Sequence, residues 1–140
     1  MNNKRVFLGG TCNNSKWRDL LIYLLKSDNY FNPVVSTWDE EAKLIEDYEK
    51  KNCEYSLYVI TPKMTGVYSI AEVVDDSNKK PDKTILCILL EDEGKVFDLH
   101  QLNSLNSVKT MVSNNGAHVF DSLLEVANFL NEQQLNNSIK

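Results

Sequence analysis

The chain of 140 residues is predicted to be a doubly wound α/β protein of flavodoxin- or Rossmann-like type, with a mostly parallel five-stranded sheet and helices on both faces. Its apolar residues change repeatedly between the continuous runs of buried strands and the three- or four-residue spacing of amphipathic helices. Strand and helix patterns alternate about five times, as they do when helices connect parallel strands. Its composition, 42% hydrophobic and 25% charged, is ordinary for a globular domain.

Length and charge limit the domain organisation and the partners. We expect residues 1–134 to form one domain and the polar residues 135–140 to fray. A net charge of −5 argues against a nucleic acid partner and against a basic membrane-binding surface. No long apolar segment or cleavage signal is found, and the three widely spaced cysteines form no CxxC pair. These features indicate a cytoplasmic protein with no membrane contact.

In the first half of the chain, strands are expected to alternate with helices. Leucines at helical spacing follow an Asn14 or Ser15 cap, and an acidic second helix follows a cap at Thr37 or Asp39. This second helix has acidic residues first and lysines last, which suits the helix dipole, and we expect it to present a solvated face. The expected strands are Lys4–Leu8, Tyr30–Val35 with an irregularity at Pro33, and Ser56–Ile60; the expected helices are Trp17–Leu25 and Glu40–Lys51.

In the second half, the apolar run KTILCILL predicts a central strand of the sheet. A third helix is expected before it, at about Val67–Asn78, and a fourth after it, at about Gln101–Ser113. A short strand and a last helix, capped by Asp121 or Ser122, complete the pattern. The sequence does not assign a structure to Val96–Leu99. The expected strands here are Lys83–Leu90 and Ala117–Phe120, and the last helix is expected to end near Gln133.

Ligands of such sheets bind outside the carboxyl ends of the strands, so the loops there are candidate sites. In the first loop, Gly9 and Gly10 would let a ligand approach the backbone, and a side chain at Gly10 is expected to block the ligand more than it harms folding. The spacing matches neither a dinucleotide fingerprint nor a P-loop, so a plain turn is equally compatible. Trp17 is expected in the core, whereas Arg18 could meet an anion.

The third helix offers a nucleophile. Ile70 belongs to its apolar stripe, and Glu72 lies about 200° from Ile70 at ~100° per residue, with Tyr68 and Ser69 on its own side. A carboxylate at this edge of a sheet can attack the anomeric carbon of a sugar and form a covalent glycosyl intermediate. A solvated helical glutamate is the alternative. His100 and His118 lack ligand spacing, and no metal or other cofactor is expected.

Two segments carry a resemblance to a known family. GVYSIAEV with the preceding YVITP, and the first loop FLGGTCNNSKWRD, resemble the nucleoside 2-deoxyribosyltransferase family, in its compact and divergent branch. The resemblance extends through Phe120 and implies transfer or hydrolysis of the N-glycosidic bond of a nucleoside or nucleotide. It places Glu72 as nucleophile and Gly9, Gly10 and Thr11 against the substrate. It also implies a homodimer or larger assembly, with 96–111 and the exposed side of the third helix as candidate contacts.

The sequence departs from that family in its acids. Gly66 stands where the family has an aspartate, and Glu54 stands near the place of another acid. Asp39, beside Trp38, is our first candidate for protonating the leaving base, ahead of Asp75, Asp76 and Asp92. The alternatives to this enzyme are a nucleotide-binding or signalling module without catalysis, and a nicotinamide-nucleotide glycohydrolase. A second carboxylate near Glu72 would favour an enzyme.

Overall fold

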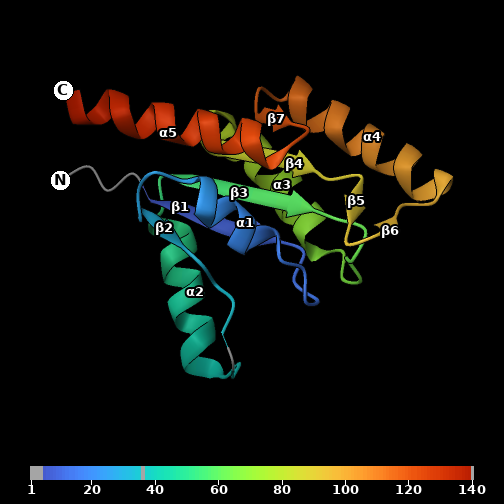
Figure 1. Ribbon diagram of the computed structural model, residues 1–140, viewed down its shortest axis with the longest axis horizontal. Helices are drawn as coiled ribbons and strands as arrows, with labels where there is room; N and C mark the ends of the chain where they lie inside the picture. Colours follow the sequence, from blue (N-terminus) through green and yellow to red (C-terminus); the bar gives the residue numbers. More distant parts are fainter. Residues whose placement is uncertain (1–4, 36, 140) are drawn as a thin grey trace.

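The computed structural model describes residues 5–35 and 37–139, with side chains through Gln133. Lys4, the expected start of the first strand, and Lys140 lie outside the described residues. A five-stranded sheet forms the centre of the molecule (Figure 1). Its strands are β1 (Val6–Gly10), β2 (Tyr30–Phe31), β3 (Tyr55–Ile60), β4 (Thr84–Ile88) and β7 (His118–Phe120). The helices are α1 (Trp17–Leu24), α2 (Glu40–Asn52), α3 (Tyr68–Lys79), α4 (Leu99–Asn114) and α5 (Leu123–Ile139).

The five strands are all parallel and lie in the order β2-β1-β3-β4-β7. This is the flavodoxin-like order, so the α/β prediction is confirmed and the strand order is now fixed. The chain moves outward from β1 to β2 and then returns to β3 on the other side of β1. The topological switch point therefore lies between β1 and β3, where Gly10 is paired with Val59. Ligands of this fold bind in the crevice at that point.

Two apolar cores cover the two faces of the sheet. Helices α1 and α5 pack against each other over one face, and α3 and α4 pack against each other over the other. Strands β3 and β4 are buried throughout, as their continuous apolar runs predict. The first core contains Val6, Leu8, Trp17, Leu21, Tyr55, Leu57, Val59, Ile85, Cys87, Val126, Ala127 and Leu130. The second contains Tyr58, Ile60, Val73, Leu86, Ile88, Leu105 and Val112.

Helix α2 belongs to neither core. It projects away from the sheet on the side opposite α4 and α5 (Figure 1), and it buries none of its residues. Its N-cap is Asp39, one of the two expected caps, whose carboxylate accepts a hydrogen bond of 2.8 Å from the Ala42 N–H. Two ion pairs fasten the C-terminal half of α2 to the body, Arg5–Glu49 and Lys50–Glu72. This placement opens a space between α2 and the sheet.

Several element ends differ from the sequence prediction. Strand β2 stops at Phe31, before the proline, so the expected second half of this strand is not formed. Helix α4 begins at Leu99 because Asp98 and Gln101 form a capping box. The unassigned segment contributes to a small antiparallel hairpin, β5 (Glu91–Asp92) with β6 (Lys95–Val96), and a 3-10 turn (Pro81–Lys83) precedes β4. Helix α5 continues to Ile139, and none of the described helices is long and apolar enough to cross a membrane.

Candidate functional site

A cleft of about 580 Å³ lies at the switch point, between the carboxyl end of β1, the loop after β3, and helices α2 and α3. Its volume is within the range of small-molecule sites. The cleft therefore occupies the place that the fold predicts for a ligand. Its lining residues are Phe7, Gly9, Gly10, Cys12, Asn13, Arg18, Pro33, Val34, Val35, Trp38, Glu46, Met64, Thr65, Gly66, Tyr68, Ser69 and Glu72.

Glu72 lines this cleft from the second turn of α3, together with Tyr68 and Ser69, so the structure brings these three predicted residues together. The Glu72 side chain is 18% exposed, and its carboxylate forms an ion pair with Lys50 of α2. The Lys50 ammonium also lies 5.8 Å from the centre of the Tyr58 ring. Glu72 is thus a partly buried, ion-paired carboxylate that faces a cavity, and not a freely solvated one.

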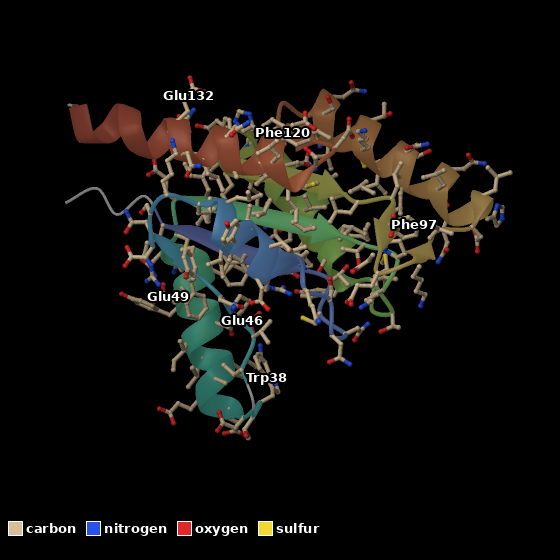
Figure 2. The ribbon with its side chains drawn as sticks, viewed as in Figure 1. Trp38, Glu46, Glu49, Phe97, Phe120 and Glu132 are labelled. Carbon is tan, nitrogen blue, oxygen red and sulfur yellow. The ribbon has the colours of Figure 1, made fainter. Side chains whose placement is uncertain are left out.

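Glu46 is a second carboxylate in the same cleft, and the sequence analysis missed it. It comes from α2, on the side toward the β2–α2 connection (Figure 2). Burial, and then the neighbouring charge of Glu72, raise the pKa of Glu46 above its ordinary value. A carboxyl group with a raised pKa keeps its proton to higher pH and can give it to a leaving group. The expectation that this helix presents only a solvated face is wrong at this residue.

The two glycines of the first loop line the cleft, but they are also required by the sheet. At Gly10 φ is +116°, and a Cβ there would lie 2.1 Å from the carbonyl oxygen of Val59. A Cβ on Gly9 would lie 3.1 Å from the Leu57 oxygen. The expectation that Gly10→Val would leave folding largely intact is therefore wrong, because the close approach is to strand β3 as well as to the cavity.

Arg18 and Thr11 form a buried polar cluster behind the cleft. Arg18 is 5% exposed. Its guanidinium donates to three backbone oxygens, those of Leu8 at 3.0 Å, Gly10 at 3.2 Å and Thr11 at 2.7 Å. The Thr11 hydroxyl accepts from the Thr61 N–H at 3.0 Å, and Thr11 is absent from the cleft lining. Both residues hold the first loop in shape, and only Arg18 reaches the cavity wall.

The four aspartates considered as proton donors lie outside the cleft lining. Asp39 caps α2 and borders a separate surface depression beside Phe31. Asp76 accepts a hydrogen bond of 2.6 Å from the Tyr58 hydroxyl, and Asp75 pairs with Lys79 on the exposed side of α3. Asp92 lies in the β5–β6 hairpin, where its carboxylate accepts hydrogen bonds from Ser15 and Thr61. Glu46 is therefore the described carboxylate that accompanies Glu72 in this cavity.

Side-chain hydrogen bonds join the loops that border the cleft. Asn13, whose φ is +42°, donates to the Lys63 oxygen at 2.9 Å and to the Thr65 hydroxyl at 2.8 Å. Asp92 accepts from the hydroxyls of Ser15 and Thr61, each at 2.6 Å. These hydrogen bonds join the first loop, the loop after β3 and the β5–β6 hairpin at the rim of the cleft.

The outer wall of the cleft is apolar. Pro33, Val34, Val35 and Trp38 line it from the connection between β2 and α2, and Trp38 is 57% exposed. An indole beside a cavity with two carboxylates offers a stacking surface for a flat ring. Among the described residues, no group of three or more His, Cys, Asp or Glu side chains is arranged to hold a metal ion.

Comparison with known families gives one match. The sequence model of the family described as nucleoside 2-deoxyribosyltransferase-like matches residues 3–89. This range runs from β1 through β4 and includes every residue that lines the cleft. Comparison with curated proteins finds no match, and comparison with solved structures finds none either. Because the match covers more than half of the chain and all of the cavity, the chain belongs to the nucleoside 2-deoxyribosyltransferase-like family.

Proposed function

We propose that the protein is an enzyme that transfers the sugar of a nucleoside or nucleotide from one base to another, with Glu72 as nucleophile and Glu46 as proton donor. The observation that carries this proposal is that both carboxylates line one cleft at the switch point of the sheet. Two carboxylates in different environments divide the roles of nucleophile and acid. A binding module would not need this pair, so the cleft favours the enzyme over that alternative.

The reaction has two balanced steps. In the first, a Glu72 oxygen bonds to the anomeric carbon while the bond to the base breaks, and the departing nitrogen takes the electron pair and a proton from Glu46. In the second, a new base attacks the anomeric carbon and gives a proton back to Glu46, and the Glu72 carboxylate is released. Water in place of the second base would give hydrolysis. Lys50 orients the Glu72 carboxylate and compensates its charge.

The apolar wall and the hydroxyl residues suit the two halves of such a substrate. The exposed face of Trp38 can stack on the base, as aromatic side chains do in many sites for flat rings. Tyr68 and Ser69, beside Glu72, can bind the sugar hydroxyls. Attack by one carboxylate with proton donation by another is chemistry that side chains can perform by themselves, and we expect the enzyme to act in the cytoplasm.

The test is base exchange by the purified protein. A panel of nucleosides and nucleotides is incubated with a different free base, and products are followed by mass spectrometry. We expect an exchanged nucleoside or nucleotide with the wild type, and a loss of several orders of magnitude in rate with Glu72→Gln. Asp75→Asn, an exposed carboxylate on the same helix, is the matched control and should keep full activity.

The outcomes separate the three candidate functions. Substrate affinity should change by less than about tenfold in Glu72→Gln, because shape and hydrogen bonding are kept. Binding without any turnover by the wild type would replace the enzyme with a binding module. Release of nicotinamide from a nicotinamide nucleotide, without base exchange, would support the glycohydrolase. Equal rates for Glu72→Gln and wild type would refute the nucleophile.

A further inference from the structure

Lys50 has access to both carboxylates of the cleft. Its ammonium forms an ion pair with Glu72 of α3, and both side chains are mostly buried. Glu46 precedes Lys50 by four residues on α2, a spacing that places two side chains next to each other on one side of a helix. A glutamate four residues before a lysine is also the favourable order for an ion pair within a helix. Lys50 therefore has a second carboxylate within reach.

The charge of Lys50 also acts on Glu46. Burial and then the charge of Glu72 raise the pKa of Glu46, while two lysines of α2, Lys43 and Lys50, act in the opposite direction. Lys43 is engaged elsewhere, in an ion pair with an exposed carboxylate of α2. Arg18 interacts electrostatically with Glu46 too, but hydrogen bonds to three backbone oxygens hold its guanidinium in place. Among these cations, the ammonium of Lys50, on its flexible four-carbon stem, is the one that can turn from one carboxylate to the other.

The reaction proposed above moves one negative charge across the cleft. In the first step, Glu72 loses its charge by forming an ester with the anomeric carbon, and Glu46 becomes a carboxylate when its proton goes to the departing base. In the second step, the attacking base returns a proton to Glu46, and the breaking of the ester restores the Glu72 carboxylate. The two side chains together carry one negative charge in both states. A single ammonium can therefore neutralise either state, provided that it changes partner.

Helix α2 depends on the ion pair of Lys50 for its attachment. It buries none of its residues, and among the described residues the ion pairs Arg5–Glu49 and Lys50–Glu72 fasten it to other elements. If Lys50 turns to a carboxylate of its own helix, a bond between two helices is replaced by a bond within α2. The C-terminal end of α2 stays held by the Arg5 pair and by the buried Cys53 that follows it. The rest of the helix is then free to move away from α3.

We propose that Lys50 passes from Glu72 to Glu46 when the sugar becomes bonded to Glu72, and that this change of partner unfastens α2 between the two half-reactions. The change rests on the proposed function, because the charge moves only if Glu72 is the nucleophile and Glu46 the acid. Glu46 and Trp38 line the cleft from α2 and from the connection before it, so their movement opens the cavity. The first base can then leave and the second can enter while the sugar stays on Glu72. The cleft closes again when the Glu72 carboxylate is restored.

The change of partner is tested in the protein without substrate. Glu72→Gln provides a side chain that is uncharged, like the ester, and the pKa of Glu46 is measured by carbon-13 NMR, with its signal identified by its absence from Glu46→Gln. Lys50→Met should raise the pKa of Glu46 in both backgrounds, and by at least about 0.5 more in Glu72→Gln, where the ammonium contacts Glu46 directly. Lys43→Met is the matched control: its effect should be equal in the two backgrounds, since the partner of Lys43 lies on the exposed side of α2.

Hydrogen exchange tests the release of α2. A helix of 13 residues is marginally stable without packing, so the backbone amides of α2 depend on its attachment for protection. In Glu72→Gln and in Lys50→Met, the amides of α2 should exchange at least about tenfold faster than in the wild type, while those of β3 should not change. Asp75→Asn, which removes an exposed ion pair within α3, is the control and should leave the exchange of α2 unaltered.

Two results would overturn the proposal. An equal effect of Lys50→Met on the pKa of Glu46 in the two backgrounds would show that Lys50 does not change partner. Equal exchange of the α2 amides in the wild type, Glu72→Gln and Lys50→Met would show that the ion pair does not fasten the helix. Both measurements use the protein without substrate, so either failure is distinct from an absence of base exchange, which would refute the proposed function and the change of partner together.

Discussion

At the scale of residues, two glutamates of the cleft have different environments, which support the different roles that we propose for them. Glu72 is joined to the Lys50 ammonium, which orients the carboxylate that we propose as the nucleophile. Glu46 has a raised pKa, chiefly through burial and then through Glu72, an arrangement that supports a carboxyl group holding a proton. The same amino acid can thus act as nucleophile and as acid within one cavity. The difference lies in burial and in the nearest charge, and not in the residue type.

The acid role of Glu46 predicts a pH dependence. The rate of exchange should fall as pH rises through the raised pKa of Glu46, since the proton needed by the leaving base is then lost. Glu46→Gln should lose about 10²–10⁴-fold in rate and should also lose this pH limb. A nucleoside with an N7-methylated purine, whose base leaves as a neutral molecule, should restore most of the rate. Steady-state kinetics across the pH range provide the measurement.

Glu40→Gln, an exposed carboxylate in the first turn of α2 that does not act on the pKa of Glu46, serves as the control and should keep the wild-type profile. Stability should follow the same titration. The unfolded chain releases the Glu46 proton near pH 4.5, whereas the native protein holds it to higher pH. The free energy of unfolding should therefore fall as pH rises through the native pKa, and Glu46→Gln should not show this fall. An unchanged pH limb in Glu46→Gln would remove Glu46 from the mechanism.

At the scale of elements, three loops act as one unit because a nearly buried carboxylate joins them. The Asp92 side chain is only 9% exposed and accepts from hydroxyls on two different loops, those of Ser15 and Thr61. It comes from the β5–β6 hairpin, which is not part of the main sheet. The hairpin is therefore a brace for the rim of the cleft. Its sequence, polar and short, gives no sign of this role by itself.

Asp92→Ala tests the brace. The change leaves two hydroxyl groups without their acceptor, so we expect the free energy of unfolding to fall by about 1–3 kcal/mol. The KM for the nucleoside should rise more than kcat falls, because the rim positions the substrate while the two glutamates are untouched. Glu93→Ala is the control: Glu93 is exposed, and its pair with Lys63 contributes little. Urea denaturation and steady-state kinetics measure both effects.

At the scale of the whole molecule, the candidate cleft and the stability of the fold depend on different parts of the chain. The family match ends at residue 89, and every residue lining the cleft precedes that point. Yet the first core, between the sheet and helices α1 and α5, includes Val126, Ala127 and Leu130 from α5. The last helix therefore stabilises the sheet that presents the candidate site, although none of its described side chains lines the cleft.

Substitutions on α5 separate these contributions. Leu130 is 1% exposed, and Leu130→Ala should lower the free energy of unfolding by about 2–5 kcal/mol through lost burial and the cavity left behind. Leu124 lies on the same helix but is 57% exposed. Leu124→Ala should therefore change the free energy of unfolding by less than about 0.5 kcal/mol. Thermal and urea unfolding provide the comparison. Equal effects of the two changes would mean that α5 does not share the core.

Much of the architecture was determined by the sequence itself. The runs around Leu57 and Leu86 are short, apolar and rich in β-branched residues, and they predict strands covered on both faces. The helical stripe that begins at Trp17 must bury that side against the sheet, and Trp17 is 2% exposed. Local patterns of this kind act over a few residues. They fix the type of each element and, through the alternation, the fold class.

Tertiary structure alone decided the composition of the cleft. The sequence led us to expect that the acidic helix α2 presents a solvated face, whereas the structure places Glu46 of this helix in the cleft and leaves Leu44 and Tyr48 exposed. Arg18 looked free to bind an anion, but three backbone oxygens surround its guanidinium. Which side of a helix turns inward depends on partners distant in the chain, here Arg5 and Glu72. A periodic pattern records only that a helix has two sides, and long-range contacts decide which of them meets the site.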